Sequence, residues 1–201
     1  SSDVCSSDLE FYSSPREVTD IQDLDIFFIG TIAGSKKRLE LLEAAAKVAY
    51  ENNYKMLVLG RVWHSHHWYQ EIIGKFKFGL KYPYLSKVVK NKVLSPEEVI
   101  TYYKRTKINL NIHIEGHTCY NCRTFEVMGN NNFLLSDIQN KYDLHLEELV
   151  HFDCYSDTNE LVEKIKYYIE HEIERNKIAY SGGCIIREKY NLTNALKLIF
   201  S

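Results

Sequence analysis

The residues best suited to chemistry lie between positions 107 and 136, where a polar loop separates two short apolar runs. The loop holds Asn121, Arg123 and Glu126 within the string N-C-R-T-F-E. This pattern predicts a buried strand, a loop, a short helix and a second buried strand. In an α/β protein, ligands bind where a strand ends and a helix begins, because the helix N-terminus offers free N–H groups and a positive dipole end. An arginine for phosphate and a carboxylate for sugar hydroxyls suit a nucleotide there.

The elements that must position this loop are short apolar runs alternating with amphipathic segments. We expect strands at residues 25–30, 55–60, 108–113 and 133–135, and weaker ones at 88–94 and 150–152. We expect helices at residues 36 to about 52, 96 to about 105, 123–129, 161–171, 173–189 and 193–200, and a helix or turn at 64–74. This alternation predicts an α/β, Rossmann-like fold: a mostly parallel sheet with helices on both faces and a helical C-terminal tail.

Three helix starts are marked by capping residues. Ser35 precedes the first helix, and Asp157 precedes the helix at residues 161–171. Ser95, followed by Pro96 and by Glu98 three positions after the serine, forms a capping box. The two glycines at positions 182–183 are expected to break the helix that contains them.

The bulk properties fit one globular domain. The chain has 201 residues, of which 45% are apolar, enough for a core. The net charge of −2 gives no reason to propose binding to nucleic acid or to an anionic membrane. We see neither a signal peptide nor an apolar run approaching the roughly 20 residues of a transmembrane segment. Five cysteines, an odd number, argue against a disulfide framework and favour the reducing cytoplasm.

The first nine residues, SSDVCSSDL, look foreign to the rest of the chain. They are polar and unpatterned, they end abruptly, and they resemble translated sequencing-adaptor read-through. We therefore interpret residues 1–9 as a non-native or disordered leader and residues 10–201 as a single domain. On this interpretation the N-terminal part of the natural protein is missing.

The order of several segments resembles the C-terminal domain of CgeB-type glycosyltransferases, which are group 1-like enzymes of the GT-B architecture. The segments are FIGT with KKR, then LVLG, SPEEVITYYKRTKINLNIH, NCRTFEVMGNNNFLLSD, and the tail that begins DTNELVEKIKYYIEHEIERNKIA. They span about residue 25 to the C-terminus. GT-B enzymes have two Rossmann-like domains, of which the C-terminal one binds the nucleotide-sugar donor. The resemblance implies that this chain is the donor-binding half, that its N-terminal partner domain is missing, and that transfer needs no metal or other cofactor.

The resemblance assigns the loop after the first strand to the donor diphosphate. Gly30 would allow close backbone approach to phosphate. Lys37 and Arg38 would offset the diphosphate charge, with Arg38 preferred as a catalytic residue for its fork geometry. Arg61, after the second strand, is a lesser candidate for donor contact.

The second assignment concerns the N-C-R-T-F-E loop. Glu126 matches the carboxylate that holds ribose hydroxyls in related enzymes and is the other catalytic candidate, while Asn121 and Arg123 would line the donor loop. Many such enzymes carry a further glutamate eight positions earlier. Here that position is Thr118, and Glu115 is out of register. The donor sugar and the anomeric outcome therefore stay open.

Two functions follow from these assignments. The first is glycosyl transfer from a nucleotide-diphosphate sugar to a glycan, lipid or protein acceptor, as in the biosynthesis of cell-surface polysaccharide. The alternative is a non-catalytic Rossmann-like module for nucleotide binding or protein interaction. G-x-G-x-x-G and P-loop fingerprints do not occur.

Two histidine-rich clusters raise the question of a metal. His113, His117, Cys119 and Cys122 form H-x3-H-x-C-x2-C, a set that could hold zinc. The spacing matches no standard finger and a second knuckle is missing, so we expect no metal. The string W-H-S-H-H-W at residues 63–68 is interpreted as aromatic packing.

Overall fold

The computed structural model of the chain describes residues 15–62, 68–116, 120–137 and 145–190, with side chains omitted at 68–71. Its sheet has six strands in the order β3-β2-β1-β4-β5-β6, and every described pairing between them is parallel. The strands are β1 (Leu24–Ile29), β2 (Met56–Leu59), β3 (Val89–Lys90), β4 (Thr106–Asn111), β5 (Leu134–Asp137) and β6 (Asp153–Tyr155). The predicted Rossmann-like α/β fold is confirmed.

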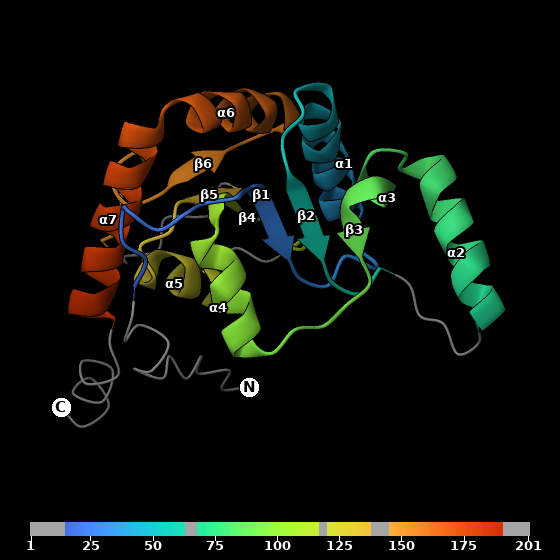
Figure 1. Ribbon diagram of the computed structural model, residues 1–201, viewed down its shortest axis with the longest axis horizontal. Helices are drawn as coiled ribbons and strands as arrows, with labels where there is room; N and C mark the ends of the chain where they lie inside the picture. Colours follow the sequence, from blue (N-terminus) through green and yellow to red (C-terminus); the bar gives the residue numbers. More distant parts are fainter. Residues whose placement is uncertain (1–14, 63–67, 117–119, 138–144, 191–201) are drawn as a thin grey trace.

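Helices cover both faces of this sheet (Figure 1). They are α1 (Lys36–Glu51), α2 (Trp68–Lys81), α3 (Leu85–Val88), α4 (Pro96–Lys104), α5 (Cys122–Gly129), α6 (Thr158–Glu170) and α7 (Glu172–Lys189). Helices α1, α3 and α6 pack with Ile26 and Phe28 in one core cluster, while α4 and α5 pack with Phe27 in the other. Successive β1 residues thus face opposite layers, as in a strand buried on both sides.

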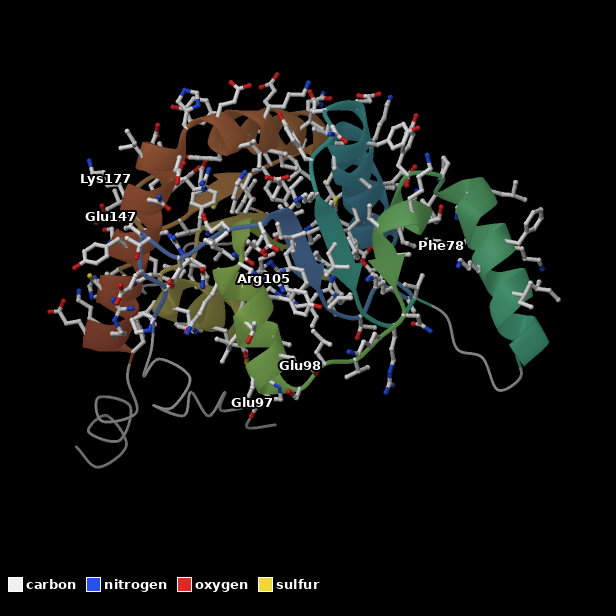
Figure 2. All side chains as sticks on the ribbon, viewed as in Figure 1. Phe78, Glu97, Glu98, Arg105, Glu147 and Lys177 are labelled. Carbon is white, nitrogen blue, oxygen red and sulfur yellow. The ribbon has the colours of Figure 1, made fainter. Side chains whose placement is uncertain are left out.

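The three predicted helix caps are present. The Ser35 hydroxyl accepts a hydrogen bond from the Arg38 N–H, and the Asp157 carboxylate accepts from the N–H groups of residues 159 and 160. Ser95 and Glu98 form the reciprocal capping box. Figure 2 shows Glu98 and its neighbour Glu97 at the start of α4. Such caps satisfy N–H groups that the helix itself leaves without partners.

Two predicted strands are shorter or displaced. Only residues 89–90 of the expected strand at 88–94 pair with β2, because 85–88 form a helical turn and the Lys92 N–H turns back to the Lys90 carbonyl. At 150–152 the amides of Val150 and His151 bond to the Glu147 carbonyl in a turn, so β6 begins at Asp153.

The two glycines at 182–183 do not break their helix, contrary to the prediction. Helix α7 runs through both glycines without a break. The neighbouring groups leave room only for small residues at this point. A Cβ on Gly182 would overlap the backbone carbonyl oxygen of His151, and one on Gly183 would overlap the Asn131 side chain. The glycines therefore allow close helix packing, which outweighs their cost in helix propensity.

Some predictions lie outside the described residues: the leader at 1–9, the cluster at 63–67 and the helix at 193–200. Within the described residues, every helix is too short or too polar to cross a membrane.

Candidate functional site

A cleft of about 660 Å³ opens at the carboxyl ends of β1 and β4. From β1 the sheet runs through β2 to β3, and from β4 it runs through β5 to β6, so the connections diverge here. This is the switch point at which open α/β sheets bind ligands. The lining residues are Thr31, Ala33, Gly34, Ser35, Arg38, His113, Ile114, Glu115, Tyr120 and Asn121.

A second recess of about 270 Å³ lies beside the cleft, at the ends of β1, β2 and β3. Its lining residues are Ile29, Gly30, Thr31, Gly60, Arg61, Lys92, Val93 and Leu94. Because Thr31 lines both spaces, the two lie next to each other. Together they place Gly30 and Arg61 beside the loop that carries Asn121.

The N-terminus of α1 points at the cleft and already holds a carboxylate. The Lys37 N–H donates to Oε1 of Glu115 over 2.8 Å. Hydrogen bonds from the Lys37 amide, then from the backbone of Glu115 itself and from the Ser35 side chain, lower the pKa of Glu115 to about 2. The carboxylate occupies the position that helix geometry offers to an anion. The glutamate that is out of register in the sequence is thus brought to the site.

Arg38 is buried in the wall of the cleft. Its Nε donates to the Ile112 carbonyl over 2.7 Å, and Nη1 donates to the Thr31 carbonyl over 2.5 Å. Burial, with the neighbouring Arg123, lowers the pKa of Arg38 to about 10, so the guanidinium stays charged at neutral pH. The side chain therefore ties the loop after β1 to the end of β4 and also supplies positive charge beside the cleft.

Lys37 contributes to a buried cluster at the ends of β4 and β5. Its Nζ lies 2.5 Å from Oδ2 of Asp137, while Nδ1 of His113 lies 2.5 Å from the other carboxylate oxygen. Burial alone would raise the pKa of Asp137, but hydrogen bonds from His113 and Lys37 lower it. The ionised carboxylate thus accepts from Nδ1–H of His113, which fixes the ring in the cleft wall.

Asn111, the last residue of β4, connects the strand to the predicted donor loop. Its side chain exchanges two hydrogen bonds with Asn121, of 3.0 and 3.2 Å, and accepts another from Nη1 of Arg123 over 2.8 Å. Asn121 also caps α5. A second Arg123 nitrogen donates to the Ile29 carbonyl at the end of β1. The arginine therefore holds α5 against the switch point.

The glycines after β1 and β2 allow the strand ends to approach each other. A Cβ on Gly60 would overlap the carbonyl oxygen of Gly30. A Cβ on Gly30 would lie 2.8 Å from Nη2 of Arg123. Both positions therefore need glycine for packing, and Gly30 leaves its backbone open to the recess.

Glu126 lies one helical turn after Arg123, between α4 and α5, and lines neither the cleft nor the recess. The Tyr103 hydroxyl donates to Oε2 of Glu126 over 3.4 Å. Burial raises the pKa of Glu126, and Arg123 opposes that shift. The structure thus brings Arg38 and Asn121 to one cleft. Arg123 braces the wall through Asn111 and Ile29 without lining the cleft, and Glu126 lies behind it.

Of the predicted histidine–cysteine set, the structure describes only His113 and Cys122. His113 is oriented by Asp137, and His117 and Cys119 lie outside the described residues. The described residues contain no group of three or more His, Cys, Asp or Glu side chains that could hold a metal.

Two side chains of the cleft region, His113 and Asp137, were not assigned to the donor site from the sequence. Both stand at the carboxyl ends of neighbouring parallel strands. Polar residues that follow two successive apolar runs are the signal that could have indicated them.

Solved glycosyltransferases share this fold. A glycosyltransferase from Rickettsia africae ESF-5 matches with a TM-score of 0.66 and 14% identity over 89% of this chain and 46% of its own. Anabaena Alr3699/HepE in complex with UDP matches with a TM-score of 0.64 and 12% identity, over 90% and 48% of the two chains. This chain thus spans less than half the length of either protein.

The C-terminal domain of a group 1 family glycosyl transferase (LpcC) from Francisella tularensis matches over 89% of both chains, with a TM-score of 0.60 and 16% identity. No curated protein matches the sequence significantly. The model of a family described as glycosyl transferase-like matches residues 37–201, most of the chain. The chain therefore belongs to the glycosyl transferase-like family.

Proposed function

We propose that this chain is the donor-binding domain of a CgeB-type glycosyltransferase, which transfers a sugar from a nucleotide-diphosphate donor to a glycan, lipid or protein acceptor. Residues 10–201 form the donor domain, and a second, N-terminal GT-B domain supplies most of the acceptor site. The observation that carries the proposal is the cleft at the β1–β4 switch point, to which α1 presents its N-terminus beside the buried Arg38. The UDP complex of the Anabaena neighbour supports this choice of ligand.

In this proposal the donor diphosphate lies at the start of α1. The helix dipole and Arg38 would stabilise the charge that develops on the departing nucleoside diphosphate. Lys37 contributes through the same turn, although its ammonium group is paired with Asp137. Because the Glu115 carboxylate occupies this anion position, the diphosphate must displace it.

The nucleoside would extend into the recess beside Arg61. Backbone atoms at Gly30 and the apolar side chains of Val93 and Leu94 offer a surface for a base. Glu126 is the proposed partner of the ribose hydroxyls. That role requires its carboxylate to exchange the Tyr103 hydroxyl for the ribose. Asn121 and Arg123 both bond to Asn111 and so hold the start of α5 against the end of β4, beside the cleft.

Calorimetric titration with UDP, GDP, dTDP and CDP tests the proposal. We expect saturable binding of one of them and about 10- to 150-fold weaker binding by Glu126→Ala, since one charge-assisted hydrogen bond contributes about 1.5–3 kcal/mol. Glu163→Ala, an exposed glutamate on α6, is the matched control and should bind like the parent chain. Equal affinity of the parent and Glu126→Ala would remove Glu126 from the site.

The second candidate is a non-catalytic nucleotide-binding or interaction module in the cytoplasm. It is favoured by the internal partners that the cationic groups already have: Glu115 at the helix start, Asp137 on Lys37, and two carbonyls on Arg38. If none of the four nucleotides binds, two explanations are left: a donor site that only the N-terminal domain completes, or the protein-interaction form of this candidate.

A further inference from the structure

Helix α2 carries a row of apolar side chains that faces away from the protein. Ile72, Ile73, Phe76 and Leu80 are 59%, 50%, 67% and 72% exposed. We call these four residues the outer stripe. Three of them recur every four positions, and the fourth lies beside the first, so they share one helix face. Most exposed apolar residues on a protein are scattered singly, and a continuous row is not.

The opposite face of α2 holds the helix on the protein. Phe78 packs against the larger core cluster and stacks at a tilt on Tyr82, with ring centroids 5.2 Å apart. Figure 2 shows Phe78 on the side of α2 that faces α3 and β3. At 100° per residue, the outer stripe lies on the far side of the helix from Phe78. Helix α2 stands at the end of the molecule beyond the edge strand β3 (Figure 1).

The segment that follows Glu71 on α2 is rich in lysine. Residues 72–96 contain six lysines and neither aspartate nor glutamate. The lysines are Lys75, Lys77, Lys81, Lys87, Lys90 and Lys92, and all six are exposed. Lys87 lies over the Tyr50 ring and Lys92 pairs with Glu98, so the three lysines of α2 are the ones that flank the stripe. Helical spacing places Lys75 on one side of the stripe and Lys77 on the other. The net charge of −2 therefore conceals a local basic region.

We propose that α2 docks the protein on an anionic phospholipid bilayer, with the outer stripe in the headgroup–acyl boundary and the lysines against the lipid headgroups. An apolar row with an aromatic side chain, flanked by lysines on a short amphipathic helix, is the pattern of an interfacial helix. Helix α2 stands at the end of the molecule, and the lysines on both sides of its outer stripe complement an anionic surface (Figure 1). The stripe lines neither the cleft nor the recess, so docking leaves both open.

Vesicle flotation tests the docking. The purified 201-residue chain is mixed with vesicles of phosphatidylcholine alone or of phosphatidylcholine and phosphatidylglycerol in a 3:1 ratio. We expect flotation with the anionic vesicles, little with the neutral ones, and a loss of binding as salt is raised from 0.05 to 0.5 M, because the lysine contribution is screened. Equal binding to both vesicle types, or no binding to either, would overturn the proposal.

Two variants separate the apolar and the charged contributions. Phe76→Ser with Leu80→Ser removes half of the stripe, and Lys75→Glu with Lys77→Glu reverses the flanking charge. Each should weaken partitioning at least 20-fold, since one basic residue near the surface contributes about 5-fold. The matched controls are Ile173→Ser on α7, 89% exposed, and Lys36→Glu with Lys47→Glu on α1.

The substituted side chains are exposed, so all four variants should unfold near the parent's temperature. Weakened binding by the controls to the same extent would show non-specific adhesion and refute α2 docking. Sedimentation velocity tests whether a second copy of the chain binds the stripe instead of a bilayer. A dimer that dissociates on Phe76→Ser with Leu80→Ser, without vesicle binding, would assign the stripe to a second copy of the chain instead.

Discussion

At the scale of single residues, the cleft contains its own anion. Glu115 accepts the amide hydrogen that the start of α1 offers to a phosphate, and this bond contributes most to lowering its pKa to about 2. The site thus holds a charged competitor for any diphosphate that enters. When the ligand binds, the hydrogen bonds of the displaced side chain are lost. The measured affinity is therefore lower than the contacts of the ligand alone would give.

The first prediction follows from this competition. Glu115→Gln keeps the shape of the side chain and removes its charge, so the cognate nucleoside diphosphate should bind about 2- to 5-fold more tightly. Calorimetry on the variant and the parent measures the change, with Glu163→Gln as the control for a lost surface charge. Unchanged or weaker binding would show that the carboxylate is not where the diphosphate binds.

The second prediction concerns Asp137 and pH. Its pKa is lowered in the folded protein, so its ionised form stabilises the fold at any pH above the unfolded value of about 3.9. That contribution is lost as the pH falls through the lowered folded pKa. Asp137→Asn should reduce the free energy of unfolding by about 1–3 kcal/mol at pH 7, and the deficit should shrink as the pH falls below 4.

Urea titrations of both proteins from pH 7 to pH 3 measure this deficit. Asp23→Asn, which removes the exposed ion pair to Arg105, should cost less than about 1 kcal/mol. A deficit for Asp137→Asn that is constant over the whole range would mean that the charge of this carboxylate is not what stabilises the fold.

At the scale of elements, glycine occurs where two segments of the chain pack closely against each other. The start of α5 is tied to β1 by Arg123, and α7 presses against the segment before β6 at Gly182. Helix propensity alone would end α7 at its two glycines, yet the helix runs from Glu172 to Lys189. Tertiary packing therefore outweighs local preference in this helix.

Gly182→Ala should therefore destabilise the protein by about 1–3 kcal/mol, because its Cβ would overlap a backbone carbonyl that cannot easily shift. Gly79→Ala on α2 is the matched control. The nearest atom to its Cβ, Oγ of Ser86, is 3.7 Å away, so the gain in helix propensity should stabilise the protein by up to about 1 kcal/mol. Thermal unfolding of both variants gives the signs. A stabilised Gly182→Ala would refute the packing account of α7.

At the scale of the whole molecule, the apolar runs predicted the four central strands and the parallel sheet to within a few residues. These strands are buried on both faces, so their composition alone identifies them. The edges were predicted less well: β3 is two residues long, and β6 begins after the expected piece. Edge strands contribute few buried side chains, so the sequence carries a weaker signal there.

The candidate site was predicted in part for the same reason. Local pattern indicated the loop that carries Asn121 and Arg123, because it joins a strand to a helix, and the family resemblance indicated the loop that carries Arg38. Neither identified the partners. The Glu115 carboxylate and the Lys37 amide are 78 positions apart, and only the fold brings them together.

The short edge strands of the sheet affect how readily copies of the protein associate through their sheets. An exposed edge strand is a template on which another chain can add a strand. Here one edge, Val89–Lys90, offers two residues with lysines at 87, 90 and 92, and the other, Asp153–Tyr155, has three residues that are all buried. Neither is long enough to register a partner strand, and lysines repel each other when like edges meet. The fold thus resists sheet-to-sheet polymerisation at concentrations where a longer, apolar edge would nucleate it.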